Sequence, residues 1–226
     1  MGDLACIRSL DLFSDLTDSQ FAQVTSCLEN RSYSKDEFLF HEGDRASRIF
    51  VLKSGRIKLF KNSWDGKELI LAFLTPDSIF GEDAVFSGET YSASAMAVED
   101  SCALVFTRSN IERILLENPG IAVKVIENLS RRLYKSTNQV SDIAFRDARG
   151  RLASALLRLS SEYGRPSQGG TLIDLNLTHQ DIANIVSLSR TTVTNLLLDL
   201  RDNELIAIRN HRIILKDQAR LADWAR

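Results

Sequence analysis

The chain has 226 residues and a formal net charge of −2, from 28 Lys and Arg against 30 Asp and Glu. Apolar residues make up 44% and charged residues 26%, which is close to the average for folded domains and excludes disordered and collagen-like classes. No apolar run reaches the roughly 18 residues that a membrane-spanning helix needs, and the first residues do not resemble a signal peptide. We therefore expect a cytoplasmic protein that makes no membrane contact.

The charges are distributed unevenly along the chain. Residues 148–226 carry 11 basic and 8 acidic side chains, whereas the first 147 residues carry 17 and 22. A uniformly basic nucleic-acid binder is excluded. The mildly basic last third indicates a nucleic-acid partner for that part, although solvated faces alone would produce the same asymmetry.

The three cysteines, Cys6, Cys27 and Cys102, are far apart and form no Cys-x-x-Cys pair. Such spacing is typical of reduced thiols rather than of a disulfide framework, and it gives no support to a zinc or iron–sulfur cage. We interpret them as small buried apolar residues, with redox sensing by Cys6 or Cys102 as the alternative.

Two patterns precede residue 110. Residues 4–30 place apolar side chains at helical spacings and predict an N-terminal helix. From Ser32 to Thr107 short β-rich runs alternate with glycine-containing turns, which is typical of an antiparallel sandwich or jelly roll. The expected strands are Phe38–Phe40, Ile49–Leu52, Ile57–Phe60, Leu69–Leu74, Ser92–Val98 and Cys102–Phe106.

After Pro119-Gly120 the pattern is helical to about Phe145. Residues at alternating steps of three and four form a heptad seam: Ile126, Leu129, Leu133, Ser136, Val140 and Ile143. The seam either covers the β domain or pairs with a second copy of the chain. A helix of about 25 residues is roughly 37 Å long and overhangs so small a domain, which favours a two-fold homodimer.

The sharpest pattern lies in the last third. Thr178 and Asp181 have the spacing of a capping box, and an apolar helical face follows. Ser187-Leu188 interrupts that face, and Ser189 offers a second N-cap for a helix through Leu200. Two short helices joined by about three residues have the proportions of a helix-turn-helix, although a hairpin that packs only on itself is the alternative.

The second helix of this motif opens with polar side chains that suit base edges in the major groove. Arg190 matches the paired acceptors of guanine, and Asn195 matches adenine. Downstream, Leu205–Ile208 and Ile213–Leu215 flank a basic segment and predict a β-hairpin wing that touches phosphates. The predicted DNA contacts are Thr178, His179, Gln180, Ser189, Arg190, Thr191, Thr194, Asn195, Arg209 and Arg212.

Enzyme signatures are missing from the sequence: there is no Gly-x-Ser-x-Gly elbow, no phosphate-binding P-loop and no dinucleotide fingerprint. We do not expect an enzyme. A ligand-binding or dimerisation module that does not bind DNA is a further alternative.

Taken in order, these features resemble the Crp/Fnr family of bacterial transcription regulators over about 200 residues. Ile79-Phe80-Gly81-Glu82 resembles the opening of the family's phosphate cassette. Residues 144–152 resemble its hinge, and residues 188–194 its recognition helix. The resemblance implies an α+β fold with an antiparallel β-roll (jelly roll) sensing domain at 1–118, a dimerisation helix and hinge at 119–147, and a winged helix-turn-helix DNA-binding domain at 148–226.

The resemblance also implies an effector pocket and a hinge. The implied pocket residues are Phe80, Gly81, Glu82, Tyr91, Ser92, Ala93, Arg132, Ser136 and Thr137, and the implied hinge residues are Phe145 and Asp147. Cyclic-AMP-binding members pair the cyclic phosphate with an arginine where Tyr91 stands here. Losing that contact costs roughly 1.5–3 kcal/mol, so another small molecule, or no pocket ligand, is favoured over cyclic AMP.

Further departures concern DNA and cofactors. Thr191 stands where cyclic-AMP-type members have a glutamate, and Asn195 where they have a second arginine, so the preferred half-site should differ. The cysteine cluster of iron–sulfur members and the histidine of haem-binding members have no match, so neither cofactor is supported. The expected partners are a palindromic double-stranded DNA operator, a second copy of the chain and RNA polymerase. The expected mechanism is a hinge shift that moves the two recognition helices of the dimer.

Overall fold

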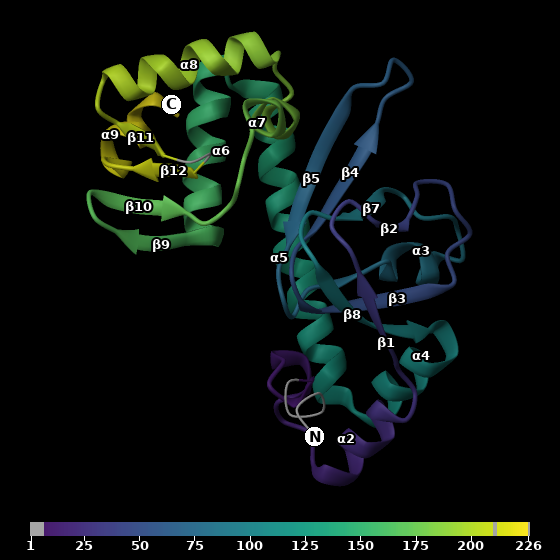
Figure 1. Ribbon diagram of the computed structural model, residues 1–226. Coiled ribbons are helices and arrows are strands. Elements are labelled where there is room, and N and C mark those ends of the chain that lie inside the picture. Colours follow the sequence, from purple (N-terminus) through teal and green to yellow (C-terminus); the bar gives the residue numbers. More distant parts are fainter. Residues whose placement is uncertain (1–6, 210–211, 226) are drawn as a thin grey trace. The chain divides into compact units, whose positions relative to one another are not determined.

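The structure is a computed structural model that describes residues 7–209 and 212–225 (Figure 1). The chain divides into two compact units, Met1–Tyr134 and Lys135–Arg226, which are described separately below. Cys6, Asn210 and His211 lie outside the described residues.

The N-terminal segment is not the single helix that the spacing of its apolar residues predicts. A short 3-10 helix, η1 (Asp11–Phe13), precedes α2 (Asp18–Thr25), and strand β1 already begins at Glu29. Thr17 caps α2 through a capping box with Gln20, and this cap starts a new helix rather than continuing an earlier one. The prediction of one helix was wrong. The chain breaks between η1 and α2, and the buried residues on each side of this break pack into the same core from two separate short helices.

The β-roll consists of two four-stranded antiparallel sheets, in the orders β1-β8-β3-β6 and β2-β7-β4-β5. This arrangement confirms the predicted fold class, and each predicted strand is present. The strands are β1 (Glu29–Tyr33), β2 (Phe38–Phe40), β3 (Arg48–Ser54), β4 (Ile57–Asn62), β5 (Glu68–Leu74), β6 (Ile79–Phe80), β7 (Ser94–Ala97) and β8 (Ser101–Thr107).

Strand β3 shows how the sequence builds this unit, because it is buried on both faces. Ile49 and Val51 pack into a core with the N-terminal helices, while Phe50 and Leu52 point into a second core between the sheets. Alternate side chains of a strand point to opposite faces, so one apolar run serves two cores.

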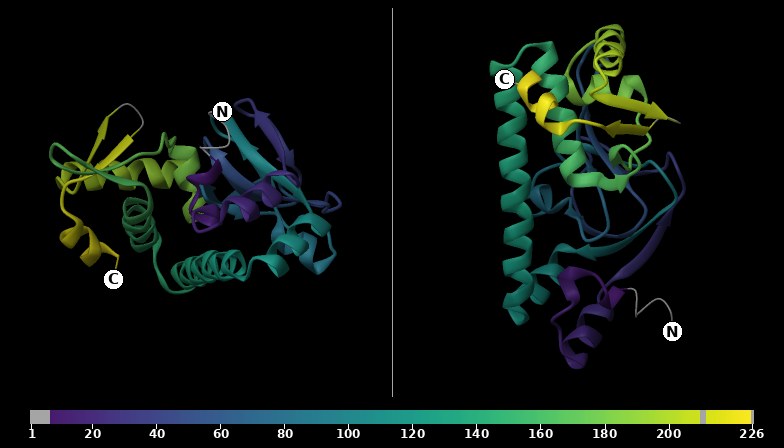
Figure 2. Two further views of the ribbon diagram at one scale, coloured as in Figure 1. Left: turned by 90° about the horizontal axis from the view of Figure 1, so that it is seen from below. Right: turned by 90° about the vertical axis from the view of Figure 1, so that its left-hand side faces the viewer.

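Three helices complete the first unit: α3 (Glu82–Ser87), α4 (Arg108–Glu117) and the start of α5 (Pro119–Phe145). Ile121 and Val125 anchor α5 in the core that contains the N-terminal helices. Figure 2 shows α5 as one unbroken helix, in agreement with the predicted boundaries. Within the described part of the chain, no helix is both long and apolar enough to span a membrane.

The second unit packs its helices against one antiparallel sheet of order β11-β12-β10-β9. The sequence predicted the helix-turn-helix and the wing but not β9, β10 or the last helix. The elements are α6 (Ala148–Tyr163), β9 (Gly164–Ser167), β10 (Gly170–Ile173), α7 (His179–Val186), α8 (Arg190–Asp202), β11 (Ile206–Arg209), β12 (Arg212–Leu215) and α9 (Gln218–Trp224).

Candidate functional site

Helices α7 and α8 form the expected helix-turn-helix. Thr178 caps α7 through a capping box with Asp181, and the Ser189 hydroxyl accepts a hydrogen bond from the Thr192 backbone nitrogen at the start of α8. Between the two helices Ser187 adopts a left-handed backbone with φ of 54°. Each cap stabilises its helix by about 1 kcal/mol and fixes where the helix begins.

The exposed face of α8 presents three polar side chains, Arg190, Thr191 and Asn195. None of the three side chains is hydrogen-bonded to another described residue. The opposite face buries Val193, Leu197 and Leu200, so the core fixes the orientation of the polar face. An exposed row of unused donors on a rigid helix suits base edges in a groove.

Other residues predicted to contact DNA already have partners. The Thr178 hydroxyl donates to Asp181 at 2.6 Å, and Gln180 donates to Asn184 at 2.8 Å. The Ser189 hydroxyl lies 2.8 Å from that of Thr192. These groups position the two helices, whatever else they contact.

His179 and Thr194 meet between the helices, with Nδ1 and Oγ1 2.9 Å apart. This contact joins the first residue of α7 to the second turn of α8, and sequence spacing alone did not suggest it.

The predicted wing is the β11–β12 hairpin, in which Arg209 pairs in register with Arg212. Arg212 lies 3.2 Å from Asp174, which also accepts from Arg165 at 2.9 Å. The charge of Arg212 is therefore partly compensated, whereas Arg209 is exposed at the end of β11.

The β-roll holds a buried carboxylate at the start of α3. Glu82 is 2% exposed, and Arg132 of α5 donates to its Oε1 at 2.8 Å. Its other oxygen, Oε2, is buried and has no hydrogen-bond partner among the described residues. Burial raises the pKa of the Glu82 carboxyl, and the Arg132 guanidinium acts in the opposite direction.

Gly81 is required at the start of this helix. Its φ is 81°, and a Cβ there would lie 3.1 Å from the Arg48 carbonyl and 3.2 Å from the Tyr91 ring. Glycine alone reaches this backbone conformation without strain, so the glycine places Glu82.

Tyr91 fills its surroundings with an aromatic ring. The ring stacks on Phe40 with centroids 3.9 Å apart, and its hydroxyl donates to the Arg48 carbonyl at 2.8 Å. Burial raises the pKa of Tyr91, so the phenol stays neutral. Phe80 stacks on Phe50 in the same core. Tyr91 therefore offers an anion no positive charge.

The remaining pocket candidates lie on different elements of the chain. Ser92 donates to Asp83 at 2.6 Å, and Ala93 is buried. Ser136 and Thr137 are exposed on α5, in the unit that begins at Lys135.

The seam of α5 is exposed in the single chain. Its apolar members have exposed fractions of 38% to 70%, in contrast to Ile121 and Val125, which are buried nearer the start of the same helix: Ile126, Leu129, Leu133, Val140 and Ile143.

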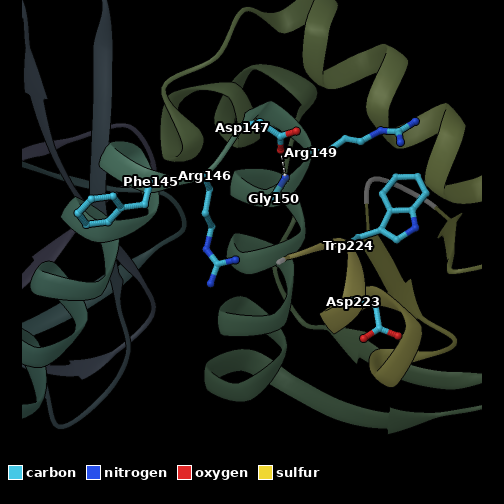
Figure 3. Close-up of a pocket in the computed structure, with 7 residues that line it drawn as sticks. All are labelled: Phe145, Arg146, Asp147, Arg149, Gly150, Asp223 and Trp224. Atoms are coloured by element: carbon cyan, nitrogen blue, oxygen red, sulfur yellow. Dashed lines mark hydrogen bonds between the residues drawn. The ribbon is translucent and has the colours of Figure 1, made fainter.

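The connection between α5 and α6 is short and strongly bonded. Asp147 caps α6, and its carboxylate accepts from the Gly150 nitrogen at 2.8 Å (Figure 3). One turn earlier, Asp142 accepts from Arg146 and Ser154, both at 2.6 Å, and lies 3.5 Å from Arg158. Lys135 and Glu162 form a further ion pair at 3.1 Å. We name this set of contacts the elbow cluster. Most of its members are far apart in sequence. Only the pair Asp142–Arg146, which is four residues apart, has a spacing from which an ion pair could be predicted.

An open cleft of about 500 Å³ lies beside the elbow, between the start of α6 and α9. Arg149 projects over the Trp224 ring at 4.6 Å and also pairs with Asp199, while Phe145 points away from them (Figure 3). The arginines of this cleft are already paired, so its charge indicates no particular ligand.

Comparison with known proteins agrees with this architecture. Residues 30–118 match a cyclic nucleotide-binding domain, and residues 150–224 match a Crp-like helix-turn-helix domain. The global nitrogen regulator of Synechococcus elongatus is 34% identical over 82% of this chain and 85% of its own. The CRP-like cAMP-activated global transcriptional regulator of Mycobacterium tuberculosis is 28% identical over 95% of this chain and 96% of its own.

Solved structures share the fold. A CooA mutant from Carboxydothermus hydrogenoformans superposes with a TM-score of 0.79 at 24% identity, covering 94% of this chain and 92% of its own. The c-di-GMP responsive regulator CLP of Xanthomonas campestris gives 0.77 at 22% identity, covering 89% and 100%. The Mycobacterium tuberculosis relative is named a transcriptional regulator, and the Synechococcus elongatus relative a nitrogen regulator. The chain belongs to the Crp/Fnr family of transcription regulators, and it combines a cyclic nucleotide-binding domain with a Crp-like helix-turn-helix domain.

Proposed function

We propose that the protein is a cytoplasmic, homodimeric regulator that binds a palindromic DNA site under the control of a small molecule other than cyclic AMP. The unused side chains of Arg190, Thr191 and Asn195 on the exposed face of α8 carry the DNA-binding part. A two-fold dimer built on the seam presents two such helices, which suits half-sites about one helical turn apart. RNA polymerase is a further expected partner.

The effector assignment rests on the orphaned oxygen of Glu82. A buried carboxylate oxygen without a donor is costly, and a ligand hydroxyl or ammonium group would satisfy it. Cyclic AMP also requires compensation of its phosphate, and Tyr91 supplies none. The relatives do not decide the ligand, because one is described as cAMP-activated and another as c-di-GMP responsive.

In this mechanism the effector contacts Glu82 and Arg132 in the β-roll unit and thereby favours one arrangement of the dimer. The recognition helices then move into register with the major groove. A differential affinity of about 1–3 kcal/mol between two dimer states changes DNA affinity 5- to 150-fold.

A regulator that needs no effector is the second candidate. The Glu82–Arg132 ion pair and the stacking of Tyr91 on Phe40 close the β-roll without any ligand. Such a protein would hold its DNA-competent state permanently.

In-vitro selection of random duplex DNA tests both candidates. The protein is incubated with no addition, with cyclic AMP, with c-di-GMP, or with a small-molecule cell extract. A palindrome enriched only with extract is the expected result, and fractionation then identifies the effector. Enrichment without addition supports the effector-independent regulator, enrichment with cyclic AMP alone overturns the interpretation of Tyr91, and no enrichment contradicts the DNA-binding proposal.

A further inference from the structure

The contact between His179 and Thr194 determines where the histidine carries its proton. Thr194 Oγ1 lies 2.9 Å from the Arg190 carbonyl oxygen and 2.9 Å from His179 Nδ1. A carbonyl oxygen only accepts, and a hydroxyl has one proton, so the Thr194 hydroxyl donates its hydrogen bond to the Arg190 carbonyl oxygen. His179 Nδ1 must therefore be protonated and donate to Thr194.

Only two forms of the ring have a protonated Nδ1. In the neutral form Nε2 has no proton and can only accept a hydrogen bond, whereas in the imidazolium Nε2 is a second donor. The helix that precedes a recognition helix crosses the DNA backbone, and phosphate oxygens accept but do not donate. A neutral His179 held in this tautomer would turn its lone pair towards an anion.

The charged groups around His179 lie on α7 itself and on the two helices packed against it, α8 and α6. His179 is the first residue of α7, where the helix dipole is positive, and Arg190 adds positive charge on α8. Asp181 is the nearest carboxylate along α7, and Thr178 already donates to it. On α6, Arg151 and Arg158 face the other end of α7, beside Ile185 and Val186. No ion pair links His179 to a carboxylate among the described residues.

We propose that His179 takes up a proton when the protein binds DNA. Nδ1–H then keeps its bond to Thr194 on α8, while Nε2–H donates to a backbone phosphate. The inference rests on the proposed function, because it requires α7 to lie at the DNA backbone. Because a phosphate at Nε2 favours the imidazolium over the neutral ring, the complex binds up to one more proton per protomer than the free protein, and DNA affinity rises as the pH falls.

The test is the pH dependence of binding to the selected operator, measured by fluorescence anisotropy between pH 5.5 and 8.5 at constant ionic strength. We expect wild-type affinity to rise by up to about tenfold per protomer for each unit of falling pH. His179→Gln keeps a side-chain donor that does not titrate, so its affinity should lose this dependence. His41→Gln, which alters a ring stacked on Phe38 in the β-roll, should behave as wild type. Circular dichroism checks that all variants fold.

Thr194→Val separates tautomer control from a simple phosphate contact. Without the hydroxyl, a neutral His179 is free to carry its proton on Nε2 and to contact phosphate without protonation. We therefore expect a shallower pH dependence than in wild type, and an unchanged slope would overturn the tautomer argument. Calorimetry in two buffers of different ionisation enthalpy should show a net proton uptake, of up to one proton per protomer, in wild type and none in His179→Gln.

Equal slopes in wild type and His179→Gln would refute the inference while leaving DNA binding intact. Failure of every variant to bind DNA at any pH would contradict the proposed function itself.

Discussion

Among single residues, Arg190 should contribute most to sequence preference. Arg190→Ala should weaken binding to the selected site by about 1–3 kcal/mol, roughly 5- to 150-fold, and relax the preference at one base pair of each half-site. Arg201→Ala, near the other end of α8, is the matched control. A selection experiment that returns the same motif from Arg190→Ala would contradict the assignment.

Glu82 and Arg132 form the ion pair on which the β-roll site depends. Arg132→Met should leave a buried carboxylate without its partner and lower the free energy of unfolding of the β-roll by roughly 3 kcal/mol. This is the low end of the range for buried pairs, because the Arg132 side chain is one-third exposed. Urea unfolding at pH 7 measures the loss. The double variant Glu82→Gln/Arg132→Met should recover most of it, and no recovery would mean that Arg132 stabilises the unit by packing alone.

The same carboxyl predicts a pH dependence of stability. Burial raises the pKa of Glu82 in the folded chain, so the folded chain holds this proton more tightly than the unfolded chain. The contribution of Glu82 to stability therefore declines as the pH rises from the ordinary glutamate pKa through the raised one. Glu82→Gln should remove that decline, which urea unfolding between pH 4 and 8 would detect. Parallel pH profiles for wild type and variant would contradict it.

At the scale of elements, the elbow cluster joins the last turns of α5 to α6. Asp142→Ala removes the acceptor of Arg146, Ser154 and Arg158 at once. We expect a loss of about 2–3 kcal/mol from the second unit and faster amide exchange in the last two turns of α5. Glu127→Ala, at an exposed position of the same helix, should change stability by less than about 0.5 kcal/mol. Equal effects of the two substitutions would mean that the cluster contributes nothing.

Elements with a strong local pattern were predictable from sequence, and those that depend on partners were not. The heptad of α5 and the capping box of α7 carry their own signals, and both agree with the structure. Strand β1 has four exposed residues out of five and is specified by its pairing with β8 rather than by its own alternation. Strands β9 and β10 are four residues each, too short for a period to appear.

The candidate site also contains features that were predictable from sequence and features that were not. The spacing of residues 189–195 was enough to predict the polar face of α8, because the helix alone brings these side chains together. The family resemblance implied one pocket for Glu82 and Arg132, and all of His179, Thr194, Glu82 and Arg132 were candidates. The direct contacts His179–Thr194 and Glu82–Arg132 join residues 15 and 50 positions apart, so only the tertiary structure reveals these contacts.

At the scale of the whole molecule, the exposed seam predicts the oligomeric state. On α5, Ile126 is 60% exposed and Val140 66% exposed. Ile126→Glu/Val140→Glu should convert a dimer to a monomer by placing like charges in an apolar interface, as sedimentation velocity would show. The monomer should lose binding to the full palindrome. A wild-type protein that sediments as a monomer at micromolar concentration would refute the dimer, and Glu127→Gln is the control.

The elbow cluster also determines where the protein can be divided. A fragment that begins at Ala148, where α6 starts, would lack Lys135 and Asp142 and would leave Glu162, Ser154 and Arg158 without these partners. A fragment that begins at Lys135 retains all of these contacts and coincides with the compact second unit. The compact unit therefore includes the last three turns of the long helix. We expect an exchange of recognition domains between relatives to succeed when the junction lies within that helix rather than at the loop after it.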